Sequence, residues 1–203
     1  MKNLFTTKNL VLMAVFSALA AVLMILEFPI PFIAPSFYEI DLSEIPILIG
    51  SFIMGPVAGV VMEAIKILLK LLIKGTTTAY VGDFANFCIG CCLVLPASII
   101  YRKLKTKKGA LIGMGVGTLT MAAAGAILNY FIMIPFFVKA FGMPLDDIIA
   151  AGTSINPLIN NKFTLVLICV APFNILKGFI DSLVTFILYK RISTFIKSIG
   201  NKK

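Results

Sequence analysis

A small set of ionisable and amide side chains lies inside long apolar stretches of the sequence. The last of these stretches carries Asn174, Lys177 and Asp181, spaced three and four residues apart, so a helix places all three along one face. Polar groups in such surroundings are costly unless they pair with each other or bind a ligand, so each marks an internal pair or a site. The remaining members of the set are Glu63, Lys66, Lys70, Asp83, Asn86 and Asn129.

Two interpretations of the last group remain open. In one, Lys177 and Asp181 neutralise each other and Asn174 hydrogen-bonds a neighbouring helix. In the other, Asn174 and Lys177 present donors to a ligand while Asp181 holds Lys177 in place. Asn86 and Asn129 fall at a similar depth in their own stretches, which favours the second interpretation and predicts a pocket for an uncharged polar ligand.

The composition determines the solvent that must surround these groups. Of the 203 residues, 60% are hydrophobic and 13% are charged, and the mean hydropathy is +1.04. Soluble domains carry about 25% charged residues, so the sequence predicts an all-α integral membrane protein. The chain has no histidine, which excludes a Ser-His-Asp triad and an HExxH zinc site. We expect neither a catalytic nor a metal site.

Apolar runs and basic clusters together predict the topology. A bilayer core of about 30 Å requires roughly 20 apolar residues as helix. The pattern predicts a single membrane domain over residues 1–203 with six transmembrane helices, at about 10–26, 45–54, 57–73, 83–101, 110–135 and 163–196. An even number of spans places the basic clusters at residues 2–8, 102–108 and 190–203 on one side, where the positive-inside rule makes them and both termini cytoplasmic. The net charge of +9 therefore needs no nucleic acid as partner.

Three segments are left on the outer side, and the shortest of them is the turn over residues 75–80. Residues 27–44 carry acidic but no basic side chains, and the connection over residues 139–162 is long enough to act as a lid. The stretch from Phe28 to Tyr38 combines prolines with aromatic residues. Such a stretch suits a wall for a planar ring system, and aromatic anchors at the membrane interface are the alternative.

A charged stripe follows the predicted third helix. Glu63, Lys66, Lys70 and Lys74 recur every three or four residues, so the stripe must face water, protein or lipid headgroups. Long lysine stems can snorkel toward the interface, which favours a structural role. Contact with a partner is the alternative.

Other patterns resemble motifs of a different chemistry. Cys88, Cys91 and Cys92 are predicted to be small packing residues rather than metal ligands. Gly113, Gly115 and Gly117 lie inside an apolar helix, where close helix packing is expected rather than a nucleotide-binding loop. No GxxxxGK[ST] occurs, so the chain has no ATP-hydrolysing P-loop of its own.

The first helix carries small residues at helical spacing. Ala14, Ala18 and Ala21, with Ser17 beside them, allow another helix to approach closely. On the inner face of the helix this means simple packing, and on its outer face it means a docking surface.

With these residues in view, the chain resembles the substrate-capture (S) components of the energy-coupling factor vitamin transporters, specifically the riboflavin-binding type. The resemblance covers almost the whole length. It rests on the segments 38–46, 55–56, 82–87, 129–130 and 172–178. It implies a bacterial cell-membrane protein that captures one vitamin molecule outside and delivers it through a transmembrane coupling subunit and two ATPase subunits. Riboflavin is then the transported substrate, no cofactor is implied, and the chain is not an enzyme.

The resemblance also implies individual roles. The flavin ring is expected against the first external loop and the outer ends of the fourth to sixth helices. The ligand-binding residues implied are Tyr38, Ile40, Asp41, Gly82, Asn86, Asn129, Asn174 and Lys177, with Ile40 and Asp41 helping to close the pocket. Ala14 and Ala18 are similar to the docking motif for the coupling subunit. The family often places tryptophan near the ligand and this chain has none, so stacking must come from phenylalanine or tyrosine.

Three alternatives compete with this function. The same fold could take another vitamin. A self-sufficient secondary carrier would need matched broken helices in inverted repeats, which the sequence lacks. An intramembrane enzyme could use Glu63 or Asp83 as acid or base, but no nucleophile is paired with either.

Overall fold

A computed structural model gives the structure of the chain and describes residues 6–201. The first half comprises α1 (Thr7–Ile25), a hairpin of β1 (Phe28–Pro29) and β2 (Glu39–Ile40), then α2 (Glu44–Met54), α3 (Pro56–Lys74) and α4 (Val81–Leu104). In the second half, α5 (Lys107–Leu128) continues through the π-helical turn η1 (Asn129–Met133) into α6 (Ile134–Ala140), and α7 (Leu145–Thr153) follows. The last run consists of α8 (Lys162–Leu165), the π-helical turn η2 (Val166–Val170) and α9 (Ala171–Asn201).

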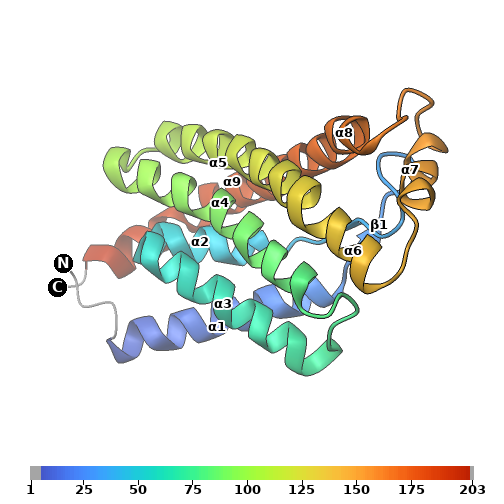
Figure 1. The fold of residues 1–203 in the computed structure, drawn as a ribbon. Helices are drawn as coiled ribbons and strands as arrows, with labels where there is room; N and C mark the ends of the chain where they lie inside the picture. Colours follow the sequence, from blue (N-terminus) through green and yellow to red (C-terminus); the bar gives the residue numbers. More distant parts are fainter. Residues whose placement is uncertain (1–5, 202–203) are drawn as a thin grey trace.

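The long helices form one bundle (Figure 1). The start of α1 and the end of α9 lie at the same end of the bundle, whereas β1, α6 and α7 lie at the opposite end. We refer to the end with β1, α6 and α7 as the loop end. The hairpin and α7 were not predicted from the sequence, and both belong to the segments that were expected outside the membrane.

Helix length and composition agree with a membrane protein. Among the described residues, four helical runs are long and apolar enough to cross a bilayer: Thr7–Ile25, Val81–Leu104, Lys107–Ala140 and Lys162–Tyr189. α3 is as long as α1, but its charged residues lower its hydropathy. Of these, Glu63, Lys66 and Lys70 are buried, whereas the apolar residues Leu68, Leu72 and Ile73 are exposed. α2 has 11 residues, which corresponds to about 16 Å of helix and half a bilayer core.

One predicted helix end was wrong. The helix of the fifth predicted span was expected to end at Pro135, but it runs on to Ala140. A proline in a helix removes one backbone donor and crowds the carbonyl four residues earlier. Here a π-helical turn comes directly before each X-Pro dipeptide. η1 ends at Met133, before Ile134-Pro135, and η2 ends at Val170, before Ala171-Pro172. The altered hydrogen bonding lets both helices continue through their prolines.

Glycines bring α4 and α5 into close contact, at two of the three glycines where the sequence predicted close helix packing. A Cβ atom on Gly113 would lie 2.6 Å from the Ala97 carbonyl oxygen, and one on Gly117 would collide with the Leu93 carbonyl oxygen. Gly115 points away, with no atom within 4 Å of its Cβ position. The Gly113 and Gly117 face therefore sets the distance between the two helices.

Two hydrophobic clusters fill the bundle. One includes Met13, Leu48 and Leu93, and the other, toward the loop end, includes Ile40, Leu165 and Phe173. Residues of both clusters line one cavity, which therefore lies between them.

Candidate ligand-binding site

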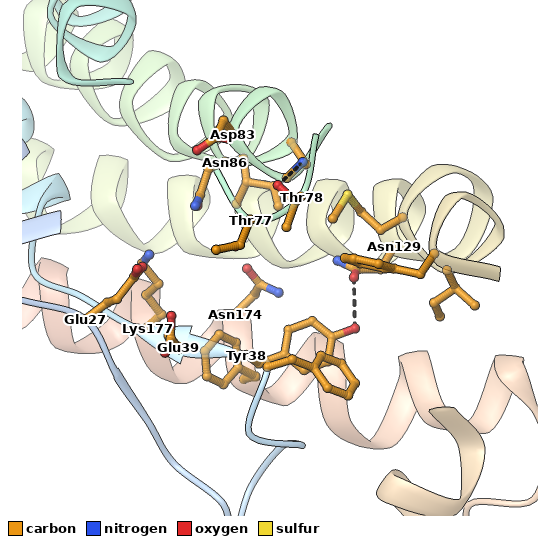
Figure 2. A pocket seen from close by; sticks show the side chains of 18 of the residues that line it. Glu27, Tyr38, Glu39, Thr77, Thr78, Asp83, Asn86, Asn129, Asn174 and Lys177 are labelled. Atoms are coloured by element: carbon orange, nitrogen blue, oxygen red, sulfur yellow. Dashed lines mark hydrogen bonds between the residues drawn. The ribbon is translucent and has the colours of Figure 1, made fainter. Parts of the chain in front are cut away.

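The cavity has a volume of about 250 Å³. Most of its lining comes from the loop end of the bundle, where the first loop (residues 26–43), the α3–α4 turn, η1, α6, α7 and the start of α9 contribute residues. Figure 2 shows labelled polar side chains from the first loop, the α3–α4 turn, α4, η1 and α9 around the cavity. The lining residues are Glu27, Phe37, Tyr38, Glu39, Lys70, Thr77, Thr78, Gly82, Asp83, Ala85, Asn86, Ile89, Met121, Asn129, Met133, Ile134, Phe137, Met143, Ile148, Phe173, Asn174 and Lys177.

Three amide side chains line this cavity from three different helices. Asn129, the first residue of η1, donates from Nδ2 to the Gly125 carbonyl at 2.8 Å and accepts from the Tyr38 hydroxyl at 2.9 Å. Asn174 on α9 donates to the Val170 carbonyl at 2.8 Å. Asn129 and Asn174 thus each use the Nδ2 group on a carbonyl four residues earlier, which fixes the orientation of both side chains at the cavity. Asn86 on α4 is half-buried and also lines the cavity.

Lys177 is held by a residue that is distant in sequence. Its Nζ lies 2.6 Å from Oδ2 of Asp41, which precedes α2, and both side chains are buried. The prediction that Asp181 holds or neutralises Lys177 is therefore wrong. Burial on its own would raise the pKa of the Asp41 carboxyl, but Lys177 and Lys66 hold it below its usual value. The Ser43 backbone N–H also donates to Asp41, at 2.8 Å.

The charged stripe on α3 faces the protein interior. Lys66 lies 2.7 Å from carboxylate oxygens of both Glu44 and Glu63, and Lys70 lies 2.6 Å from Asp83. Snorkelling is therefore wrong for Lys66 and Lys70, because carboxylates on α2, α3 and α4 neutralise them where they stand. Lys74, at the exposed end of the stripe, pairs with Glu27 at 2.6 Å.

The α3–α4 turn forms the polar wall opposite the first loop. Thr76 donates to Asp83 at 2.6 Å and accepts from two backbone N–H groups of the turn. Ala79 and Tyr80 have positive φ, an uncommon conformation that often accompanies functional sites. Gly82 is required here, since a Cβ would lie 2.5 Å from Oγ1 of Thr78.

Aromatic rings supply the apolar wall. Tyr38 and Phe173 have ring centroids 5.8 Å apart, and Phe37 stands 4.8 Å from Tyr38. Burial raises the pKa of Tyr38, so its hydroxyl stays protonated and donates to Asn129. Phe28 and Phe32 of the same loop are exposed instead. The loop therefore contains both kinds of aromatic residue that the sequence allowed: some form a wall of the cavity, and others are exposed.

An acidic pair lies at the mouth of the cavity. Glu27 follows α1 and Glu39 lies on β2, and both line the cavity. Partial burial and the neighbouring Glu27 carboxylate raise the pKa of Glu39, against the opposing influence of Lys74 and Lys70. These two residues were predicted to lie outside but were not predicted to belong to the site.

Most predicted ligand-binding residues meet at this cavity. Tyr38, Gly82, Asn86, Asn129, Asn174 and Lys177 all line it. Ile40 and Asp41 do not line it: Ile40 is buried in the hydrophobic cluster toward the loop end, and Asp41 lies behind Lys177. Alternation along the strand explains this difference, because Glu39 faces the cavity and its neighbour Ile40 faces the core.

The hydrophobic members of the lining were not predicted from the sequence. Phe173 is adjacent to Asn174, and Met121, Met133 and Phe137 flank Asn129 at helical spacing. Helical periodicity around the two asparagines was the available signal. Met143 and Ile148 belong to the 139–162 connection, whose expected role as a lid agrees with their position at the cavity.

A family model for the ECF transporter substrate-specific component matches residues 8–189. The chain belongs to this family. Among curated relatives of this substrate-specific component is the riboflavin transporter RibU of Staphylococcus aureus (strain TCH60), 34% identical over 197 residues, which cover 97% of this chain and 96% of the relative. The riboflavin transporter FmnP of Bacillus subtilis (strain 168) is 32% identical over 191 residues, 94% of each chain.

A solved structure of an S component of a bacterial ECF transporter also resembles this substrate-specific component. The two chains are 34% identical and superpose with a TM-score of 0.73, over 94% of this chain and 98% of the other.

The small residues on α1 divide between two faces. Ala14 and Ala18 are exposed beside Val11, Val15 and Leu19, so they belong to an apolar outer surface. Ala21 and Ser17 are buried, and Ser17 donates to the Met62 carbonyl of α3 at 3.3 Å. The inner face of α1 packs on the bundle, and its outer face is available to a second helix.

Proposed function

We propose that this substrate-specific component binds riboflavin in the cavity and serves as the capture subunit of an ECF-type importer. The observation that carries the proposal is the convergence of three amides and Lys177 on an aromatic-walled cavity. Two relatives that are 34% and 32% identical to this chain over the aligned residues are named riboflavin transporters, which supports the same ligand.

The chemistry of riboflavin fits the lining of the cavity. Its isoalloxazine ring is flat, with one polar edge that carries donors and acceptors, and its ribityl chain carries hydroxyls. In the proposed complex the ring packs against Tyr38 and Phe173, and Asn129, Asn174 and Lys177 bond the polar edge or the hydroxyls. Asn86, Thr77 and Thr78 then face the ligand from the α4 side.

The cavity volume bears on how the ligand enters. Small-molecule sites commonly enclose about 300–1,000 Å³, and the present cavity, at about 250 Å³, lies just below that range. Admission of a three-ring ligand therefore requires the first loop or the 139–162 connection to move outward. Both segments line the cavity through few residues and lie at the loop end of the bundle.

The topology and partners follow from the same proposal. α2 and α3 complete six membrane helices in the bacterial plasma membrane, with both termini cytoplasmic and the cavity facing outward. The exposed Ala14 and Ala18 face of α1 docks the transmembrane coupling subunit, and two ATPase subunits supply the energy. The chain itself catalyses no reaction, needs no cofactor, and carries riboflavin as cargo.

Binding to the purified chain tests the proposal. The fluorescence of riboflavin should be quenched when it binds to the chain. Binding should saturate at one molecule per chain, and vitamins of other ring systems should not compete with it. Saturable binding of a different vitamin would assign another ligand to the same fold. Uptake by the purified chain alone in liposomes, without ATPase partners, would instead indicate a self-sufficient carrier.

A further inference from the structure

A network of buried charges adjoins the cavity, and the binding site accounts for only part of it. Its members are at most 5% exposed and come from α2 and the residues before it, from α3 and from α9. They are Asp41, Glu44, Glu63, Lys66, Lys177 and Asp181. Four carboxyl groups thus share two ammonium groups.

Each lysine of this network already has a carboxylate partner. Lys66 forms ion pairs with Glu44 and Glu63, and Lys177 forms an ion pair with Asp41. Asp181 is completely buried, and neither of its carboxyl oxygens has a hydrogen-bond partner among the described residues. An isolated buried carboxylate is so unfavourable that such a group takes up a proton instead. Asp181 therefore carries a proton in this conformation.

Asp181 nevertheless lies within reach of an ammonium group. Lys177 is four residues earlier on α9, and side chains at this spacing are neighbours on a helix surface. Lys177 thus has two alternative carboxylate partners. Asp181 is fixed on the same helix, whereas Asp41 follows the hairpin strand that carries the cavity residue Glu39.

We propose that Asp181 is a proton-binding residue that exchanges with Asp41 as the partner of Lys177 when the cavity opens and closes. In the closed conformation Asp41 pairs with Lys177 and Asp181 is protonated. When the first loop withdraws, Asp41 enters water as a carboxylate and Lys177 turns to Asp181. The O–H bond of Asp181 then breaks and its proton passes to the solvent that enters the opened cavity.

The surroundings of Asp181 leave it few other partners. The charged groups that act on it are Lys177 of its own helix, Glu44 of α2, Asp41 before α2, and Lys66 of α3. Between residues 109 and 128, α5 carries no charged side chain. Cys169 of η2 belongs to the hydrophobic cluster toward the loop end, about three helical turns from Asp181.

This exchange links binding to protons. It rests on the proposed function, because ligand capture is what closes the loop. The closed state holds one more proton than the open state, so riboflavin binding takes up as much as one proton per molecule. The affinity then rises as the pH falls, by at most about tenfold per pH unit.

Proton uptake can be measured by calorimetric titration of riboflavin in buffers with different ionisation enthalpies, at several values between about pH 5 and 8. The native protein should take up protons on binding. Asp181→Asn, which resembles protonated aspartic acid in shape, should keep riboflavin binding and lose the uptake. Asp146→Asn, on the exposed start of α7, is the matched control and should behave as the native protein. Glu39→Gln reports separately on the acidic pair at the cavity mouth.

Two results would overturn the proposal: riboflavin binding without proton uptake across this pH range, or undiminished uptake in Asp181→Asn. Failure of riboflavin to bind would refute the proposed function instead. Infrared titration of the ligand-free protein then tests the proton site alone. A carbonyl band of a protonated carboxyl that Asp181→Asn removes supports the site, and the absence of such a band at every pH overturns it.

Discussion

The Lys177–Asp41 ion pair gives the sharpest prediction about single residues. The two side chains come from elements 136 positions apart, lie 2.6 Å apart and are both buried. Lys177→Met removes the ammonium group and keeps an unbranched apolar stem, so it leaves the Asp41 carboxylate buried without its main partner. Removing one member of a buried pair costs about 3–5 kcal/mol, and we expect a loss of that size in the free energy of unfolding.

A second substitution identifies the partner. Lys177→Met combined with Asp41→Asn removes the stranded charge and should recover most of the lost stability, because an apolar or neutral replacement of a whole buried pair is close to neutral. Lys177→Met combined with Asp181→Asn should recover little. Lys74→Met, which breaks the exposed pair with Glu27, is the control and should cost less than about 1 kcal/mol.

Unfolding titrations in mixed detergent and SDS, followed by circular dichroism, measure all four variants on one scale. Recovery by Asp181→Asn and not by Asp41→Asn would refute the assignment of the pair and restore the partner expected from sequence spacing. A loss below about 1 kcal/mol in Lys177→Met would show that the pair is solvated, contrary to its burial.

Three further predictions concern the ligand, the partner and the helix packing. Asn174→Ala should weaken riboflavin binding by about 1–3 kcal/mol, the cost of leaving a buried polar group of the ligand unmatched, and an unchanged affinity in fluorescence titration would remove Asn174 from the site. Ala18→Phe should leave riboflavin binding intact and abolish uptake in liposomes that contain the complete transporter, whereas Val22→Phe on the same exposed helix tests whether any bulky group has this effect. Gly113→Ala should destabilise the fold by about 1–3 kcal/mol through overpacking against the Ala97 carbonyl. In Gly115→Ala the added Cβ meets no atom within 4 Å, so the free energy of unfolding should be unchanged or slightly increased.

Local spacing was sufficient to find much of the site. Asn174 and Lys177 stand out because polar groups are rare in apolar helices, and both line the cavity. The long apolar runs predicted the main helices for a similar reason, since burial in lipid dictates hydropathy over many residues. Close helix packing was predicted at Gly113 and Gly117, where it occurs, but its partner helix α4 was not predicted.

Long-range pairing was not readable from the sequence. Asp181 seemed the natural partner of Lys177 because helical spacing shows only neighbours on the same helix, whereas Asp41 reaches it through the fold. Snorkelling was considered for Lys66 because one of its two carboxylate partners, Glu44, lies on another helix and is not visible from the spacing along α3. The π-helical turns were missed because a proline, which here lies two residues after each of them, usually ends or kinks a helix.

The most direct test of the central claim is the absorption spectrum of the protein purified from riboflavin-containing cells and separated from free ligand. We predict a yellow protein whose spectrum contains the flavin bands, with one flavin per chain and quenched flavin fluorescence. A colourless protein that also fails to bind added riboflavin saturably would contradict the assignment of this cavity to riboflavin.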